Sequence, residues 1–231
     1  MGYCGCLNSL LSAINGVVAV SPRPGVLTQQ PASLLKKSSL PNPLGKRHQV
    51  SLAAGSVVPL LKNSLWLVNR GMVKLGAVTE QGDELLLGLV GPYETFGEPL
   101  SVVQAYEAVT LTECDLICLT LEEVAQSPAL AMAVVKAVSA RLRQADFMLA
   151  LLGLRRVEDR VRGFLELVAQ DYGQPCEKGL RLGLRLTHQE IASALSTTRV
   201  TVTRVIGQFK DQGWLQIDAQ RHLVVTHLSP R

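Results

Sequence analysis

Apolar residues near the C-terminus recur with a helical period in two stretches that a short polar segment separates. The two apolar stripes consist of Ile191, Ala192 and Leu195, and of Val202, Val205, Ile206 and Phe209. Thr187 precedes the first stripe, and Glu190 lies three residues after Thr187. This spacing is the signature of a capping box. The polar run 196–198 supplies cap-forming residues for the second stretch. The pattern therefore predicts two short helices joined by a tight turn, a helix-turn-helix.

The second predicted helix carries polar side chains in its first two turns and apolar ones behind them. Arg199 and Arg204 are five positions apart, so they lie about 140° apart around the helix axis and flank one face. Arginine is the best bidentate reader of guanine in the major groove, and Val200 between them can contact a thymine methyl. This arrangement is typical of a recognition helix. The alternative is a helical hairpin whose arginines are merely solvated.

A small β-hairpin is predicted directly after this helix. Gly213 can end the helix, residues 214–217 alternate apolar and polar, residues 218–221 resemble a turn, and residues 222–225 return. The hairpin would form the wing of a winged helix. It argues against the plain helical hairpin.

A longer helix is predicted over residues 130–153. Its apolar residues repeat at spacings of 4 and 3 and are Ala131, Val135, Val138, Leu142, Ala145, Leu149 and Leu152. We call this stripe the seam. A sustained 3.5-residue period favours contact between two parallel helices, which predicts a homodimer. The alternative is that the seam packs against the chain's own sheet.

Short stretches of apolar residues separated by glycine turns fill residues 49–121. Many short strands at this spacing predict a small antiparallel barrel or jelly roll. Combined with the helical C-terminal part, they place the chain in the α+β class. The expected division is a flexible arm over 1–46, a β-roll sensor over 47–123, a dimerisation helix over 124–153 and a winged helix-turn-helix over 154–227.

Composition narrows the choice of function. The chain of 231 residues is 47% hydrophobic and 18% charged, with a net charge of +4, and basic residues outnumber acidic ones after residue 155. A long apolar run and a basic signal region are both missing from the sequence, so we expect a cytoplasmic protein. The five cysteines show no spacing typical of disulfides, and we expect no metal and no cofactor.

The sequence contains no catalytic pattern. Its four histidines are scattered, and it has no HExxH, P-loop or GxSxG motif. We therefore expect no enzyme. The alternatives to a sequence-specific regulator are a small-molecule sensor without DNA function and an architectural DNA-binding protein, and the paired arginines argue against the latter.

Segments 171–179, 186–192 and 196–207 resemble the CRP/FNR family of bacterial transcription regulators, in particular the NtcA-like regulators of cyanobacteria. The resemblance covers roughly residues 49–225. It implies a cyclic-nucleotide-binding type of β-roll, a homodimer on double-stranded DNA and an interaction with RNA polymerase.

The same resemblance assigns roles to the helix-turn-helix. It places base reading on Arg199 and Arg204, with Val200 where the cyclic-AMP receptor subgroup has a glutamate, and this implies a palindrome of the GTA-N8-TAC kind. The positions that it implies for phosphate contacts are Thr187, Gln189, Thr198 and Thr201.

The resemblance also points to an effector pocket. Phe96-Gly97-Glu98 matches a family signature, but the loop after it lacks the cation that a cyclic phosphate needs, which argues against cyclic AMP. For 2-oxoglutarate, Arg141 and Asp146 occupy the family's helix positions, while Gln104 stands where an arginine is expected. Losing that contact costs about 2–3 kcal/mol. The pocket is therefore either retuned for another small anion or filled as structural core.

Overall fold

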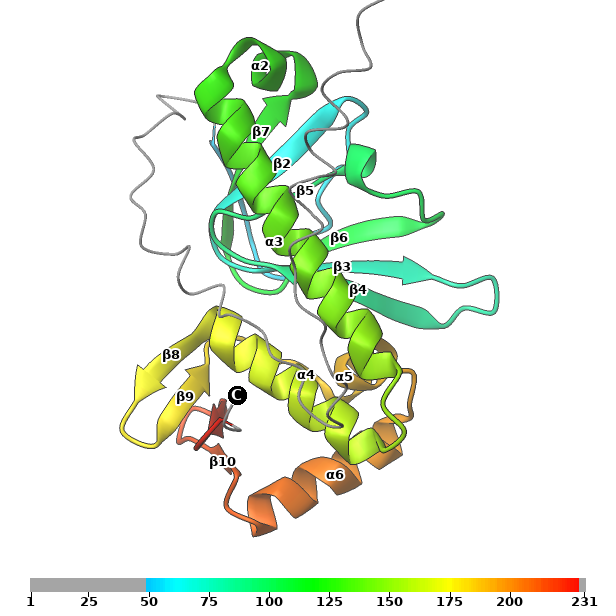
Figure 1. Ribbon diagram of the computed structural model, residues 1–231, viewed down its shortest axis with the longest axis vertical. Coiled ribbons are helices and arrows are strands. Elements are labelled where there is room, and N and C mark those ends of the chain that lie inside the picture. Colours follow the sequence, from blue (N-terminus) through cyan, green and yellow to red (C-terminus); the bar gives the residue numbers. More distant parts are fainter. Residues whose placement is uncertain (1–48, 229–231) are drawn as a thin grey trace, which may run out of the picture. The chain divides into compact units, whose positions relative to one another are not determined.

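The computed structural model describes residues 49–228 and confirms the α+β class (Figure 1). The expected arm, residues 1–46, lies outside the described residues. In the part that is described, no helix is both long and apolar enough to cross a membrane.

Two antiparallel sheets form the β-roll. The first has the order β1-β7-β2-β5 and the second the order β4-β3-β6. The strands are β1 (Gln49–Leu52), β2 (Ser64–Arg70), β3 (Val73–Val78), β4 (Glu84–Val90), β5 (Thr95–Phe96), β6 (Tyr106–Thr110) and β7 (Cys114–Thr120). Buried side chains from both sheets, among them Val68, Val73, Phe96 and Leu116, make the core of the roll.

Glycines stand where the roll turns, as the sequence predicts. Gly71, between β2 and β3, has a φ of +94°, and a Cβ there would lie 2.3 Å from the carbonyl oxygen of Glu113. Only glycine fits such a close approach with this backbone. Between β3 and β4, Thr79 and Asp83 close the hairpin through a backbone hydrogen bond of 2.9 Å.

Two helices follow the roll where one was expected from residue 124. These are α2 (Leu121–Gln126) and α3 (Pro128–Leu152). Thr120 caps α2 in a capping box with Glu123, and the Ser127 side chain accepts a hydrogen bond at the start of α3, whose first residue is Pro128. Because proline disfavours a helical conformation in the residue before it, the chain breaks at Ser127 instead of continuing α2.

The two faces of α3 have different surroundings. One face contacts β4 and β5. The buried residues of α3 lie on this face and are Leu130, Ala137, Gln144, Met148 and Leu151. The seam lies on another face: Val135, Leu142 and Leu149 are 56%, 60% and 70% exposed. The alternative that the seam packs against the chain's own sheet is therefore wrong, because a different stripe does so.

The C-terminal part combines helices with one small sheet. Its elements are α4 (Val157–Tyr172), β8 (Gly173–Cys176), β9 (Gly179–Leu182), α5 (His188–Ala194), α6 (Arg199–Asp211), β10 (Leu215–Ile217) and β11 (Leu223–Val225). The sheet has the order β10-β11-β9-β8, so the predicted wing hairpin is present and pairs with a second hairpin that the sequence did not indicate. Phe164, Ile191, Val205, Phe209 and Trp214 belong to the core beneath α4, α5 and α6.

Candidate nucleic-acid interface

The first helix of the pair, α5, begins in the capping box that its sequence predicts. The Thr187 hydroxyl accepts a hydrogen bond from the Glu190 amide at 3.1 Å, and the Glu190 carboxylate accepts one from the Thr187 amide at 2.8 Å. Two backbone donors that α5 would otherwise leave unpaired are satisfied. The start of α5 is thereby fixed at one residue.

The turn to α6 is as tightly specified. Ser196 adopts a φ of +50°, and the Thr197 amide donates to the carbonyl of Ala192 at 3.1 Å. From α4, Arg160 donates to the carbonyl of Leu195 at 2.9 Å, which satisfies an acceptor at the end of α5. Thr198 then caps α6 through the amide of Thr201 at 3.2 Å. These contacts fix the angle between the two helices.

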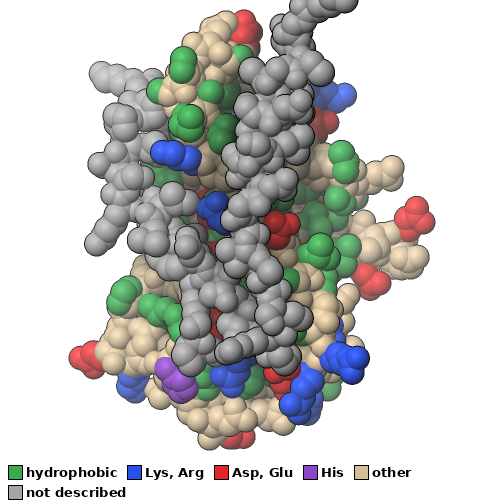
Figure 2. Space-filling model, in the orientation of Figure 1, with side chains coloured by type: hydrophobic (Ala, Val, Ile, Leu, Met, Phe, Trp, Pro, Cys, Tyr) green, Lys and Arg blue, Asp and Glu red, His purple; other side chains and the backbone are tan. Residues whose placement is uncertain are grey.

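Helix α6 divides into a buried and an exposed face, as the sequence predicts. Val202, Val205, Ile206 and Phe209 are buried. Arg199, Val200, Thr203 and Arg204 are exposed, and Val200 retains 78% of its accessible surface. Figure 2 shows Lys and Arg side chains on the part of the molecule where Figure 1 draws α4 and α6. In the described part of the chain, the face of α6 opposite its buried residues is exposed and carries two arginines.

The two candidate base-reading arginines differ in their surroundings. Among the described residues, no hydrogen bond or ion pair engages the guanidinium of Arg199. That of Arg204 pairs with the carboxylate of Glu158 at 3.0 Å and donates to Gln208 at 3.3 Å. The sequence pattern did not indicate Glu158, which lies 46 residues before its partner.

The residues expected to contact phosphates also differ from one another. Gln189 is exposed, and the hydroxyls of Thr198 and Thr201 lie 2.9 Å apart at the start of α6. The Thr187 hydroxyl, in contrast, donates to Glu190 at 3.0 Å while it caps α5. Its single hydrogen is therefore used within the protein, and a phosphate would have to displace the Glu190 carboxylate to receive it.

His188 connects the two helices and was missing from the expected site. Its Nδ1 lies 2.8 Å from the Thr203 hydroxyl, which itself donates to the carbonyl of Arg199 at 2.9 Å. Partial burial lowers the pKa of His188, and the charges of Lys210 and Arg199 lower it further. The lowered pKa favours the neutral imidazole, and the contact with its Nδ1 ties the Thr203 hydroxyl of α6 to α5.

A polar cluster holds the wing to the neighbouring hairpin. Arg181 on β9 donates to the Asp218 carboxylate at 2.5 Å and also contacts Gln220 and His222. The Asp218 carboxylate further accepts from the backbone amides of His222 and Gln220. The amide of His222 and the guanidinium of Arg181 lower the pKa of Asp218 from 3.8 to about 2.

This pKa predicts how the wing responds to acid. A carboxylate with a lowered pKa in the folded state contributes stability above its unfolded pKa of 3.8 and loses that contribution as the pH falls through about 2. We expect Asp218→Asn to be less stable than the wild type at pH 5 and the difference to shrink between pH 4 and pH 2. Urea unfolding at several pH values measures this difference. A difference that stays constant down to pH 2 would contradict the prediction.

Polar contacts also join the roll to the helix-turn-helix part. Lys74 on β3 pairs with Glu190 of the α5 capping box at 3.0 Å. The Tyr172 hydroxyl, at the end of α4, lies 2.8 Å from the Glu94 carboxylate and receives a hydrogen bond of 2.8 Å from buried Gln144 of α3. Burial and the charge of Glu94 raise the pKa of Tyr172 well above its usual value. The strands of the roll therefore contact the helix that begins the helix-turn-helix.

The expected effector residues come together only in part. Arg141 lies against β4, where a side chain at Gly88 would place its Cβ 2.4 Å from the guanidinium. The charge of Arg141 also acts on Tyr106, whose hydroxyl hydrogen-bonds the backbone of Gly97. Arg141 donates to Gln144 at 2.5 Å, and Gln144 accepts from the Leu89 amide. This small polar group lies between α3 and the roll.

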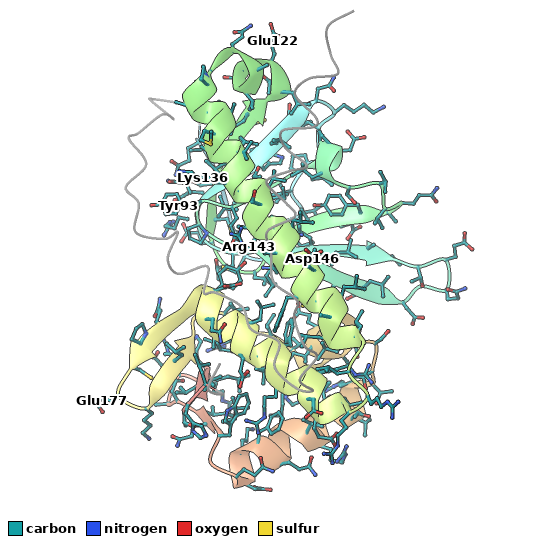
Figure 3. All side chains as sticks on the ribbon, viewed as in Figure 1. Tyr93, Glu122, Lys136, Arg143, Asp146 and Glu177 are labelled. Atoms are coloured by element: carbon teal, nitrogen blue, oxygen red, sulfur yellow. The ribbon has the colours of Figure 1, made fainter. Side chains whose placement is uncertain are left out.

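The other expected effector residues are placed differently. Phe96 is buried in the core, whereas Glu98 and Gln104 are exposed. Asp146 is exposed on α3 (Figure 3) and lies five residues beyond Arg141, which puts the two side chains about 140° apart around the helix. Among the described residues, no hydrogen bond or ion pair joins Asp146 to the polar group of Arg141 and Gln144.

The fold and this interface define a DNA-binding protein with an N-terminal β-roll and a C-terminal helix-turn-helix. Residues 61–127 match the cyclic nucleotide-binding domain, and residues 159–229 match the Crp-like helix-turn-helix domain. The chain belongs to the CRP/FNR family, and it is a DNA-binding transcription regulator of that type.

Individual relatives agree with this assignment. The global nitrogen regulator of Nostoc sp. strain PCC 7120 is 32% identical over 68% of this chain and 74% of its own length. The regulatory protein CysR of Synechococcus elongatus is 33% identical over 81% of this chain and 88% of its own length. A crystal structure of a CRP/FNR-family transcriptional regulator from Thermus thermophilus superposes with a TM-score of 0.64 at 28% identity, covering 78% of this chain and 94% of that one.

Proposed function

We propose that the protein acts as a homodimer that binds a palindromic site of the GTA-N8-TAC kind and regulates transcription there, in contact with RNA polymerase. The observation that carries this proposal is the exposed face of α6, where Arg199, Val200 and Arg204 stand on a helix whose opposite face is buried. A rigid, exposed helix with arginines in its first two turns fits the major groove. Arginine there prefers guanine, and Val200 has no polar group for cytosine.

The homodimer is proposed from the seam. Leaving large apolar residues such as Leu142 and Leu149 exposed on one helix is unfavourable unless a partner covers them. The heptad spacing suits the same helix of a second copy, and alanine at two seam positions permits close approach. A twofold pair of α6 helices would sit about 34 Å apart, one turn of DNA, which is why we propose a palindrome.

The test compares the GTA-N8-TAC duplex with a scrambled duplex of equal length by fluorescence anisotropy. We expect Arg199→Ala and Arg204→Ala each to weaken the binding free energy by about 1–3 kcal/mol on the palindrome and little on the scrambled duplex. The reason is that a lost base contact removes discrimination between base sequences. Gln189→Ala and Thr201→Ala are the matched variants, because a lost phosphate contact weakens binding to both duplexes by the same amount.

Two outcomes would contradict this assignment. Equal affinity of the wild type for both duplexes would exclude sequence-specific binding to this palindrome. Equal losses on both duplexes for the two arginine variants would show that the arginines contact phosphates instead of bases.

For the effector, we propose that the roll does not respond to cyclic AMP and responds at most weakly to 2-oxoglutarate. The segment from Glu98 to Ala105 contains no Arg or Lys to pair with a cyclic phosphate, and exposed Gln104 replaces the expected arginine. Arg141 remains as a cation for a different small acid.

Calorimetric titration measures both ligands directly. We expect no heat of binding with cyclic AMP and a dissociation constant for 2-oxoglutarate about two decades weaker than a site with the second arginine would give. Tight binding of 2-oxoglutarate that Arg141→Ala abolishes would show that Gln104 is an adequate replacement. Binding of cyclic AMP at similar strength would overturn the pocket argument.

A further inference from the structure

Arg204 is restrained on the protein surface by groups from two helices. Its guanidinium donates to Glu158 of α4 at 3.0 Å and to Gln208, one turn further along α6, at 3.3 Å. Glu158 lies in the first turn of α4, where its own backbone amide and the guanidinium of Arg204 lower the pKa of its carboxyl. An acidic side chain in the first turn of a helix is also stabilised by the helix dipole. The acceptor that faces Arg204 is therefore a carboxylate at the start of α4.

The restraint leaves part of the guanidinium available. Of the five N–H donors of an arginine, Glu158 and Gln208 engage one each. The remaining donors keep a fixed plane, and the side chain is still 54% exposed. Such an arginine can present its remaining donors to a base edge without first losing the rotamer freedom that an unrestrained side chain loses.

We propose that Glu158 is a positioning residue for Arg204 and that it raises the sequence specificity of the DNA interface. It acts in two ways. It holds the guanidinium in the orientation for a base edge, and it competes with the phosphates that would otherwise capture a free arginine at any sequence. The inference rests on the proposed role of Arg204 in base reading.

Asp159 provides a matched control for the charge of Glu158. It is the next residue in the first turn of α4, it is exposed, and in the part of the chain that is described no hydrogen bond or ion pair joins it to Arg204. Asp159→Asn and Glu158→Gln each remove one negative charge from the first turn of α4. Glu158→Asp keeps the charge but shortens the side chain by one methylene.

The experiment measures dissociation constants on specific and scrambled duplexes over a range of salt. The specific duplex is GTA-N8-TAC or the sequence that in vitro selection with the wild-type protein returns. We expect Asp159→Asn to tighten binding to both duplexes by the same factor. The specificity ratio, which is the dissociation constant on the scrambled duplex divided by that on the specific duplex, should stay unchanged. We expect Glu158→Gln to lower the specificity ratio about fivefold, which corresponds to the upper end of the free energy of a surface ion pair. Glu158→Asp should lower the specificity ratio by a smaller factor.

Salt dependence supplies a second readout. A released Arg204 can neutralise one more phosphate on scrambled DNA, so the slope of log affinity against log salt should steepen by about 0.9 in Glu158→Gln and not in Asp159→Asn. In the Arg204→Ala background, Glu158→Gln should change the specificity ratio no further. Thermal unfolding of each variant confirms that the fold is kept.

The outcomes separate this inference from the proposed function. If Arg204→Ala leaves the specificity ratio unchanged, the base-reading role of Arg204 is wrong and the inference is overturned with it. If Arg204→Ala lowers the ratio but Glu158→Gln and Asp159→Asn behave alike in ratio and salt slope, only the positioning role of Glu158 is overturned.

Discussion

Leu142→Glu is expected to abolish the homodimer and, with it, tight binding to the palindrome. Leu142 is 60% exposed at the middle of the seam. In a parallel pair of α3 helices the twofold axis brings the two substituted carboxylates close together, and burying each costs several kcal/mol. The dimer dissociation constant should rise more than a hundredfold. Sedimentation velocity at micromolar concentration measures the monomer that results.

Lys136→Glu is the control for this substitution. Lys136 is exposed on α3 outside the seam (Figure 3), so the same side chain is introduced on the same helix without entering the proposed contact. It should leave the sedimentation coefficient unchanged. A wild type that is monomeric at micromolar concentration and binds isolated half-sites with full affinity would contradict the proposed dimer.

Trp214→Ala is expected to destabilise the DNA-binding part by about 3–5 kcal/mol, as truncation of a buried aromatic side chain does. Trp214 is 2% exposed, its ring centroid lies 4.9 Å from that of Phe209, and its Nε1 donates to the carbonyl of His227. The guanidinium of Arg162 stacks over the Trp214 ring at 4.3 Å. Truncation therefore removes the packing behind α6 together with a cation–π contact.

Urea unfolding followed by circular dichroism measures this loss, and anisotropy should show DNA binding lost with it. Trp214→Phe is the matched variant, because it keeps most of the buried ring and removes the hydrogen bond, so a smaller loss of about 1–2 kcal/mol is expected. A loss below about 1 kcal/mol for Trp214→Ala would show that Trp214 does not support α6.

The helix-turn-helix could be predicted from the sequence because its determinants are local. The capping box of Thr187 and Glu190, the polar break at residues 196–198 and the positive φ of Gly213 after α6 all act within a few residues along the chain. The apolar stripe of α6 likewise repeats at the helical period. Each of these signals needs no knowledge of the rest of the fold.

Other features escaped prediction because their signal is short or ambiguous. The hairpin of β8 and β9 has strands of only four residues with a proline in the first, and its stability comes from pairing with the wing strand β11. In α3, Leu130, Ala137, Met148 and Leu151 form a second apolar stripe beside the seam. Periodicity alone cannot say which stripe meets the roll.

By itself, then, the sequence determined the α+β class, the motif that faces DNA and the two arginines offered for base reading. Only the tertiary structure decided that the seam is exposed, that Lys74 pairs with Glu190 across 116 residues and that Glu158 restrains Arg204. The physical reason is that capping and periodicity are set by neighbours three or four residues away. An ion pair between distant residues exists only once packing has brought their helices and strands together.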